Sequence, residues 1–324
     1  MKPWITALLL GLCLQAQAFD LQGHRGARGL SPENTLAGFA LTLSLGVSTL
    51  ETDIAVSRDG VLLISHDPAL NPDITRGPDG QFLAARGPVI WHTDVAELQR
   101  YDVGRLRPGT RYAAQYPEQK PHDGARLPKL DELFALVKRS GNEQVRLALE
   151  IKVRPDAPDE TMAPEPFARK LVDAVRQAGM APRTTILSFD WRVLQAVQKL
   201  APEIGTVYLS IQQRSFDNIG AGLAGVSPWT AGFGHAEHGS VPKMVKAAGG
   251  RIWSSFHGEL DAAKVKEAQG LGLTVLAWTV NEPARIAQVM DMGVDGIVSD
   301  RPDLVRQEMQ RRGMPLPTAT PVLP

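Results

Sequence analysis

The sequence has almost no cysteine. Its 324 residues contain one, Cys13, which lies in the apolar N-terminal segment. A single cysteine forms no disulfide within the chain. The stability of the folded protein must therefore come from the burial of apolar groups, with a bound metal ion as a further source.

The sequence also lacks an excess of charge of either sign. Lysine and arginine together number 35, aspartate and glutamate together number 35, and the formal net charge is +0. Proteins that bind nucleic acid or an anionic membrane surface usually carry a basic excess. The composition therefore gives no electrostatic argument for either partner, while 43% hydrophobic residues are enough for a full core.

Long apolar runs are missing too, apart from one at the N-terminus. Lys2 supplies positive charge, Ile5–Leu14 is almost wholly apolar, and residues 16–18 (Ala-Gln-Ala) match a cleavage site. This pattern is typical of a secretory signal peptide at residues 1–18. The run is too short for a membrane anchor, and the leucine before Cys13 is a poor match to a lipoprotein signal. We therefore expect a soluble exported protein, periplasmic or secreted, without stable membrane insertion.

Strand and helix patterns alternate along the rest of the chain. Strand-like segments begin near residues 20, 49, 145, 184, 205, 251, 273 and 294, and a helical pattern follows each. In the first unit, Ser31 followed by Pro32 predicts the N-cap and first position of the helix. Eight such units in a chain of this length favour a closed (β/α)₈ TIM barrel over an open doubly wound sheet. We expect one α/β domain over residues 19–311.

Three stretches interrupt the alternation. Residues 67–128 are dense in Pro, Gly, Asp and Arg, which predicts a small insertion after the second strand, packed over one end of the core. Residues 211–240 are rich in Gly and Ser and show no clear period. Residues 312–324 form a Pro- and Thr-containing tail that we expect to be disordered.

Acidic side chains mark two of the predicted barrel strands. Glu51 and Asp53 are two residues apart in an apolar segment, so they project from the same face of a strand. Glu150 and Lys152 repeat this spacing in the next barrel strand. Functional side chains of a parallel barrel gather at the C-terminal ends of its strands, so the three carboxylates are expected to converge. Hard oxygen ligands in this number suit one divalent cation, Ca²⁺ or Mg²⁺.

Imidazole and cationic groups are expected beside these carboxylates. His24 and Arg25 end the first strand, and His66 follows a short strand predicted at 61–64. Two imidazoles suit a general acid and a general base, while Arg25 and Lys152 suit an anion next to the metal. A single histidine is more often structural than catalytic, and Lys152 could simply form an ion pair with Glu150. Together they are the groups that cleavage of a phosphodiester beside a divalent cation uses.

A series of short motifs resembles the glycerophosphodiester phosphodiesterases, in the order found in that family. The motifs are Gly23-His24-Arg25-Gly26, Pro32-Glu33-Asn34-Thr35, Glu51-Thr52-Asp53, His66-Asp67, Leu149-Glu150-Ile151-Lys152, Ala277-Trp278-Thr279-Val280-Asn281 and Gly293-Val294-Asp295-Gly296-Ile297-Val298-Ser299-Asp300. They span residues 21–304. The resemblance implies a TIM barrel with an insertion after the second strand, and a divalent metal held by Glu51, Asp53 and Glu150.

The resemblance also implies roles for the groups around the metal. His24 and His66 would be the acid/base pair, Arg25 and Lys152 would contact the phosphate, and Trp278 would line the pocket against the glycerol carbons. The implied reaction is hydrolysis of a small-molecule glycerophosphodiester to glycerol 3-phosphate and an alcohol.

Several points stay open at the level of sequence. These are Ca²⁺ against Mg²⁺, the alcohol, which histidine is the base, the oligomeric state, and whether water attacks directly or the glycerol 2-hydroxyl first forms a cyclic phosphate. A lysophospholipase D or sphingomyelinase D-like activity is one alternative and needs an apolar groove for an acyl chain. A non-catalytic protein that binds glycerophosphodiesters is another. The lack of an obvious amphipathic membrane-binding segment favours the deacylated substrate, and the intact histidines and carboxylates favour catalysis.

Overall fold

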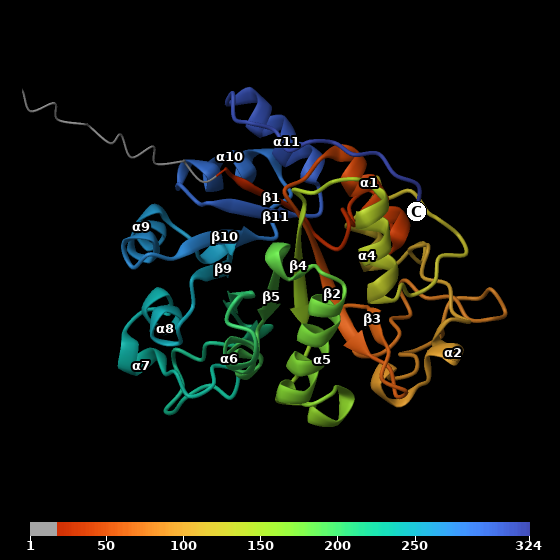
Figure 1. Ribbon diagram of the computed structural model, residues 1–324, viewed down its shortest axis with the longest axis horizontal. Coiled ribbons are helices and arrows are strands. Elements are labelled where there is room, and N and C mark those ends of the chain that lie inside the picture. The colour runs from red at the N-terminus through yellow and green to blue at the C-terminus, as the bar shows by residue number, and fades with distance from the viewer. Residues whose placement is uncertain (1–17) are drawn as a thin grey trace, which may run out of the picture.

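Eight parallel strands close into a barrel in the computed structural model of the chain, which describes residues 18–324 (Figure 1). In barrel order the strands are β1 (Asp20–Gly23), β2 (Thr49–Val56), β4 (Arg146–Ile151), β5 (Thr184–Ser188), β6 (Gly205–Ser210), β9 (Ile252–Phe256), β10 (Thr274–Trp278) and β11 (Gly296–Ser299). β1 pairs in parallel with both β2 and β11, and this double pairing closes the barrel. The predicted (β/α)₈ fold is confirmed, whereas residues 1–17 of the predicted signal peptide lie outside the described part.

A helix follows each barrel strand and packs on the outside of the barrel (Figure 1). The helices are α1 (Leu36–Leu45), α4 (Leu130–Arg139), α5 (Pro164–Gln177), α6 (Trp191–Leu200), α8 (Val241–Ala247), α9 (Ala262–Gly270), α10 (Pro283–Asp291) and α11 (Pro302–Arg311). In α6, Trp191, Leu194 and Val197 recur at helical spacing and are fully buried against the strands. No helix among residues 18–324 has the length and apolar character that crossing a bilayer requires.

Two apolar layers form the core of the barrel. The larger one lies between strands and helices and includes Phe39, Phe167 and Trp191. A smaller one fills the barrel interior with side chains such as Leu187 and Leu276. Because this inner layer is apolar, charged side chains that point inward lie at the two ends of the barrel: Asp20 and Arg146 pair at the amino ends of the strands, and the polar site described below occupies the carboxyl ends.

The predicted insertion leaves the barrel through a short antiparallel ribbon. β3 (Leu62–Ile64) pairs antiparallel with the end of β2, and the chain then runs through irregular structure before α4. Its short helices are η1 (Ile90–His92), α2 (Val95–Leu98) and α3 (Arg111–Ala114). A separate apolar cluster that includes Leu63, Ile90 and Leu98 holds this insertion together. It lies beside β3 at one side of the barrel (Figure 1).

The second irregular stretch, 211–240, contains little regular structure. It holds a two-stranded hairpin, β7 (Gln212–Gln213) and β8 (Phe216–Asp217), and the short helix α7 (His235–His238). The remaining short helices are η2 (Pro158–Glu160), η3 (Ala181–Arg183) and η4 (His257–Glu259).

The start of the first helix differs from the sequence prediction. Ser31 is not the N-cap; Thr35 is, and its hydroxyl accepts the N–H of Gly38 at 3.1 Å. The prediction is wrong because Asn34 has a left-handed backbone (φ 56°), which breaks a helix that would begin at Pro32. Residues 32–34 thereby remain in the loop before α1, and this loop contributes side chains to the polar site described below.

The C-terminal tail also differs from the expectation of disorder. Residues 312–324 contain no helix or strand beyond the end of α11, yet they lie along α1 and reach α4 (Figure 1). The N–H of Thr320 donates to the carbonyl of Leu43 at 2.9 Å, and Arg306 donates to the carbonyl of Pro317 at 2.7 Å. The tail shows no periodic apolar pattern, so its sequence did not indicate these contacts; Met314 and Val322 also pack against the core.

Candidate active site

The polar side chains predicted from the sequence meet at the carboxyl ends of the barrel strands. They line a cavity of about 140 Å³ together with an apolar wall. The predicted residues that line it are His24, Arg25, Glu51, His66, Glu150, Lys152 and Trp278. Asp53, the remaining predicted residue, is fully buried beside them and contacts Arg25 and Lys152.

Three carboxylates converge as predicted. Asp53 of β2 and Glu150 of β4 are direct partners in the strand register, and Glu51 lies two residues before Asp53. One oxygen from each of the three lies within 4.8 Å of the others, and all three side chains are buried. Such a cluster holds more negative charge than a buried site tolerates without compensation.

The carboxylates differ in how far neighbouring groups compensate their charge. Burial, reinforced by the charges of Asp53 and Glu150, raises the pKa of Glu51 well above its usual range. Burial likewise raises the pKa of Glu150. Burial opposes ionisation of Asp53 too, but Lys152 and Arg25 outweigh it and hold its pKa well below the usual range.

These residues fit a divalent cation. Asp53 Oδ1 and Glu150 Oε1 are buried and accept no hydrogen bond of good geometry, although the ammonium of Lys152 lies 3.0 Å and 2.7 Å from them. Oxygen atoms of this kind, with lone pairs left over and a shared excess of negative charge, are the donors that Ca²⁺ and Mg²⁺ use. The donor set contains no sulfur and no nitrogen ligand among its three members.

Arg25 and Lys152 lie on the cationic side of the cluster. Arg25 Nε is 3.2 Å from Asp53 Oδ2, and its Nη1 donates to Glu33 Oε1 at 2.9 Å. The loop that carries Arg25 turns sharply, because Arg25, Gly26 and Ala27 all have left-handed φ angles. A Cβ on Gly26 would come within 3.0 Å of the backbone of Gly38, so this tight turn requires glycine there.

His24 is held by a carboxylate on the side away from the cavity. Its Nδ1 lies 2.6 Å from Asp300 Oδ1, directly after β11, while Nε2 lies 3.8 Å from Glu51 Oε2. Burial, together with the charges of Arg28 and Arg25, lowers the pKa of His24 to about 4 against the opposing effect of Asp300. At neutral pH the ring is therefore uncharged, with its proton on Nδ1 facing Asp300 and its Nε2 free to accept a proton.

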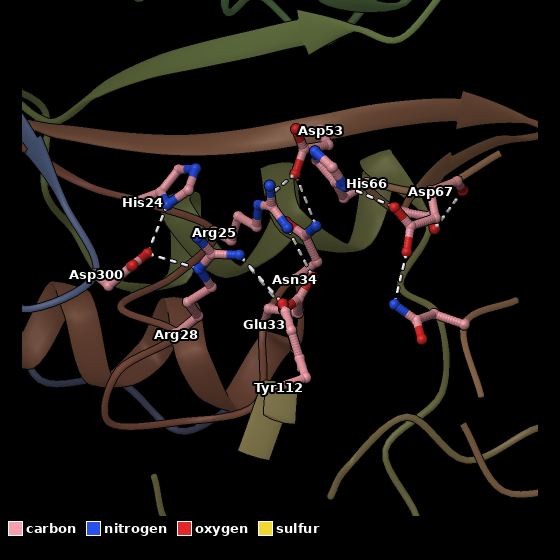
Figure 2. A network of polar contacts seen from close by, with 12 residues as sticks. His24, Arg25, Arg28, Glu33, Asn34, Asp53, His66, Asp67, Tyr112 and Asp300 are labelled. Atoms are coloured by element: carbon pink, nitrogen blue, oxygen red, sulfur yellow. Dashed lines mark hydrogen bonds and ion pairs between the residues drawn. The ribbon is translucent and has the colours of Figure 1, made fainter. Parts of the chain in front are cut away.

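His66 has a parallel arrangement from the other side. Its Nδ1 lies 2.8 Å from Asp67 Oδ1, and Asn71 donates to Asp67 Oδ2 at 2.8 Å. Burial and the charges of Arg25 and Lys152 lower the pKa of His66. Each histidine thus presents Nε2 with a carboxylate behind Nδ1. Both rings line the cavity together with Glu51 and Glu150, and Figure 2 shows Arg25 between them.

The opposite wall of the cavity is apolar and aromatic. Leu187, Phe189, Leu209 and Trp278 line it. The indole N–H of Trp278 donates to the carbonyl of Ser254 at 3.1 Å, and its ring meets Phe189 edge-on at 5.4 Å between centroids. Trp278 is therefore fixed as a flat wall facing the charged groups, which agrees with the predicted position.

Sequence reasoning missed much of the supporting network. The sequence indicates Glu33, Asn34, Asp67 and Asp300 only as members of motifs and predicts no role for them. In the structure they orient catalytic candidates: Asn34 donates to Asp53 Oδ2 at 3.0 Å, for example. The hydroxyl of Tyr112, in the insertion, donates to Glu33 (Figure 2). The sequence could not predict this contact, because no motif or spacing connects Tyr112 to the barrel strands.

Comparison with known proteins gives one consistent family. The model of the glycerophosphoryl diester phosphodiesterase family matches residues 24–304. A solved structure from Silicibacter pomeroyi DSS-3, whose assignment to this activity is provisional, is 34% identical with a TM-score of 0.82, covering 92% of this chain and 95% of that chain. A glycerophosphodiester phosphodiesterase of Caldanaerobacter subterraneus is 25% identical over 292 residues, covering 90% of this chain and 97% of the relative.

A further solved structure shares the fold. A phosphodiesterase of Oleispira antarctica, in complex with the product sn-glycerol-3-phosphate, has a TM-score of 0.63 and 23% identity, and the match covers 90% of this chain and 96% of that chain.

Proposed function

The chain belongs to the glycerophosphoryl diester phosphodiesterase family, and we propose that it hydrolyses glycerophosphodiesters to glycerol 3-phosphate and an alcohol in a metal-dependent reaction. One observation carries the proposal. Two histidines, each with a carboxylate behind Nδ1, flank a buried cluster of three carboxylates in a single cavity. Acid/base groups on both sides of a cation site are what in-line displacement at phosphorus needs.

Glu51, Asp53 and Glu150 would hold one divalent cation, Ca²⁺ or Mg²⁺. When bound, this ion would neutralise negative charge on the phosphoryl oxygens and orient the phosphate. Arg25 and Lys152 would supply further positive charge to the phosphate. Both side chains line the cavity next to the carboxylates and would contact the phosphate directly.

His24 and His66 would act as the acid/base pair. One imidazole accepts the proton of the attacking hydroxyl group through Nε2. The other has to enter this step as the imidazolium, protonated at both nitrogens, and donates its Nε2 proton to the departing alcohol oxygen. The carboxylates behind them, Asp300 and Asp67, keep Nδ1 protonated and each ring in place. Trp278 would pack against the carbon atoms of the substrate on the opposite wall.

The test is a hydrolysis assay with a defined panel. Purified protein is incubated with glycerophosphocholine, glycerophosphoethanolamine, glycerophosphoglycerol and lysophosphatidylcholine, each with Ca²⁺, Mg²⁺ or a chelator. Glycerol 3-phosphate is measured for the deacylated substrates, and free choline is measured for both choline esters. We expect release from the deacylated substrates only with a cation. Binding of glycerophosphocholine without turnover under every condition would support the non-catalytic alternative, and preference for lysophosphatidylcholine would support the lysophospholipase D alternative.

We also propose that the protein is exported after cleavage behind Ala18. The proposal rests on the N-terminal sequence pattern alone. Expression with a C-terminal tag in a bacterial host, followed by fractionation and N-terminal sequencing, tests it. A mature periplasmic chain beginning at Phe19 is expected, and an intact Met1 in the cytoplasmic fraction would contradict export.

A further inference from the structure

Asp300 connects His24 to an arginine that the mechanism above does not use. Its Oδ1 accepts from Arg28 Nε at 2.7 Å as well as from His24 Nδ1 at 2.6 Å (Figure 2). Its Oδ2 accepts from the side-chain amide of Asn281 at 2.8 Å. The carboxylate is 1% exposed, so these donors replace its water shell. The position of the His24 ring therefore depends on a carboxylate that Arg28 and Asn281 hold in place.

Arg28 in turn is held by the insertion. Its Nη1 donates to the hydroxyl of Tyr112 at 3.1 Å, and its guanidinium carbon lies 5.0 Å from the ring centroid of Tyr116. The rings of Tyr112 and Tyr116 meet edge-on with their centroids 5.4 Å apart, so each ring helps to hold the other in place against Arg28. Arg28 thus contacts Asp300 on the barrel side and the two tyrosines on the insertion side.

Hydrogen bonds to backbone carbonyls also connect the insertion to the loop that carries Arg28. The side chain of Gln119 donates to the carbonyl of Arg28 at 2.7 Å, and the N–H of Lys120 donates to the carbonyl of Leu30 at 3.0 Å. The segment 112–120 of the insertion therefore packs directly on the loop that carries His24 and Arg25. A part of the chain far from β1 in sequence thus supports the loop that carries these site residues.

We propose that Arg28 is a positioning residue for the acid/base centre, and that Tyr112 and Tyr116 make the insertion a working part of the active site. Arg28 acts through Asp300, which orients His24; the inference rests on the proposed role of His24. Arginine suits this task because its planar fork makes two directional contacts while its face stacks on an aromatic ring. Lysine carries a compact ammonium group without a fork or a planar face, so it cannot reproduce both the directional contacts and the stacking.

The first test compares Arg28→Gln, Arg28→Lys and Tyr116→Leu with the parent chain, using glycerophosphocholine and the activating cation. Arg28 also lines the cavity, but the proposed phosphate contacts of Arg25 and Lys152 remain without it. Arg28→Gln should therefore lower kcat about 10- to 100-fold and change KM less than about threefold. Arg28→Lys should recover part of kcat, and Tyr116→Leu, which removes only the stacked ring, should give a smaller fall. The control is Arg105→Gln, which removes an exposed insertion arginine paired with Asp123 and should leave kcat unchanged.

A double-substitution cycle tests the route through Asp300. Asp300→Asn should lower kcat, and adding Arg28→Gln should lower it by less than about threefold more, since residues that act through one another are not additive. Fully multiplicative losses, a rise in KM with kcat unchanged, or parental kcat in Arg28→Gln would overturn the inference. His24→Ala separates the two proposals: if it keeps full activity, the proposed role of His24 fails; if it is inactive while Arg28→Gln is unaffected, only the positioning role fails.

Discussion

Asp53 on β2 and Glu150 on β4 face each other as register partners, and the ammonium of Lys152 touches both, at 3.0 Å and 2.7 Å. One lysine thus lies close to two buried carboxylates. Within residues 18–324, the one hydrogen bond to Glu51 beside them comes from the backbone N–H of Arg25, at 3.0 Å. The cluster is short of positive charge at the place where a cation is proposed to bind. This shortage leads to the first prediction.

Glu51→Gln should abolish stabilisation by metal. Addition of Ca²⁺ or Mg²⁺ at about 100 times its Kd should raise the unfolding free energy of the parent protein by about 2.7 kcal/mol and leave Glu51→Gln unchanged. Without metal, the variant should be at least as stable as the parent at pH 8, because glutamine removes a buried charge. Thermal unfolding with and without cation measures both effects, with Glu165→Gln on the surface of α5 as the control. An equal metal shift in Glu51→Gln would contradict the ligand assignment.

His66→Ala should lose most activity and remain folded. We expect kcat to fall about 10²- to 10⁴-fold, the usual contribution of a general acid or base, while the melting temperature changes little because the side chain is one-third exposed. His122→Ala, an exposed histidine of the same insertion, is the matched control. Near-parental turnover in His66→Ala would remove this residue from the acid/base pair.

Asn34→Ala should destabilise the folded protein by about 2–4 kcal/mol. Asn34 donates to Asp53 Oδ2 and accepts from Thr52 Oγ1 at 2.9 Å, and its φ of 56° is unfavourable for alanine. Asn34→Gly tolerates that φ, so it should be less destabilising by about 1 kcal/mol, the cost of the backbone alone. Urea unfolding of both variants measures the difference. A loss below 1 kcal/mol in Asn34→Ala would show that the network adds little stability.

Trp278→Ala should weaken substrate binding more than it slows the chemical step. Removing the ring opens the apolar wall beside Phe189, and KM for glycerophosphocholine should rise about 10-fold, equivalent to about 1.4 kcal/mol. Trp278→Phe keeps a flat ring while losing the hydrogen bond to Ser254, so it should lie between parent and alanine variant. An unchanged KM with a lowered kcat would contradict a packing role.

Acidification should reveal an ion-pair cluster at the end of α11. Hydrogen bonds from Arg311 and Arg312 lower the pKa of Glu308 to about 2, and the side chain is 12% exposed. Because the folded pKa lies below the unfolded value, this stabilisation is complete above about pH 4.5 and disappears as the pH falls towards 2. Glu308→Gln should therefore be less stable than the parent at pH 7, with the gap closing between pH 4.5 and 2 in urea titrations. A gap independent of pH would contradict this account.

The fold and the chemical centre were predictable from the sequence because both depend on local patterns. Strand periodicity placed Glu51 and Asp53 on one face, and the rule that strands of a parallel barrel point the same way brought Glu150 to the same end. The start of α1 was not predictable in this way, since Ser31 and Pro32 form a good local helix start. The left-handed Asn34 overrides them because its side chain binds Asp53 and Thr52.

Contacts between distant segments were beyond sequence reasoning. No spacing rule connects Tyr112 to Arg28. Asp300 contacts His24 only because closure of the barrel places the end of β11 next to β1, so its role could not be predicted from the sequence around it. The contacts of the tail with α1 are backbone hydrogen bonds, which leave no pattern in side-chain chemistry.

The central claim is that Glu51, Asp53 and Glu150 hold one divalent cation between two histidines. The most direct measurement is anomalous X-ray scattering from crystals grown with Mn²⁺ in place of Mg²⁺, in a form shown to hydrolyse glycerophosphocholine. The account predicts one strong peak in contact with oxygen atoms of all three carboxylates. A peak elsewhere, or an active crystal form with no peak at these residues, would contradict it.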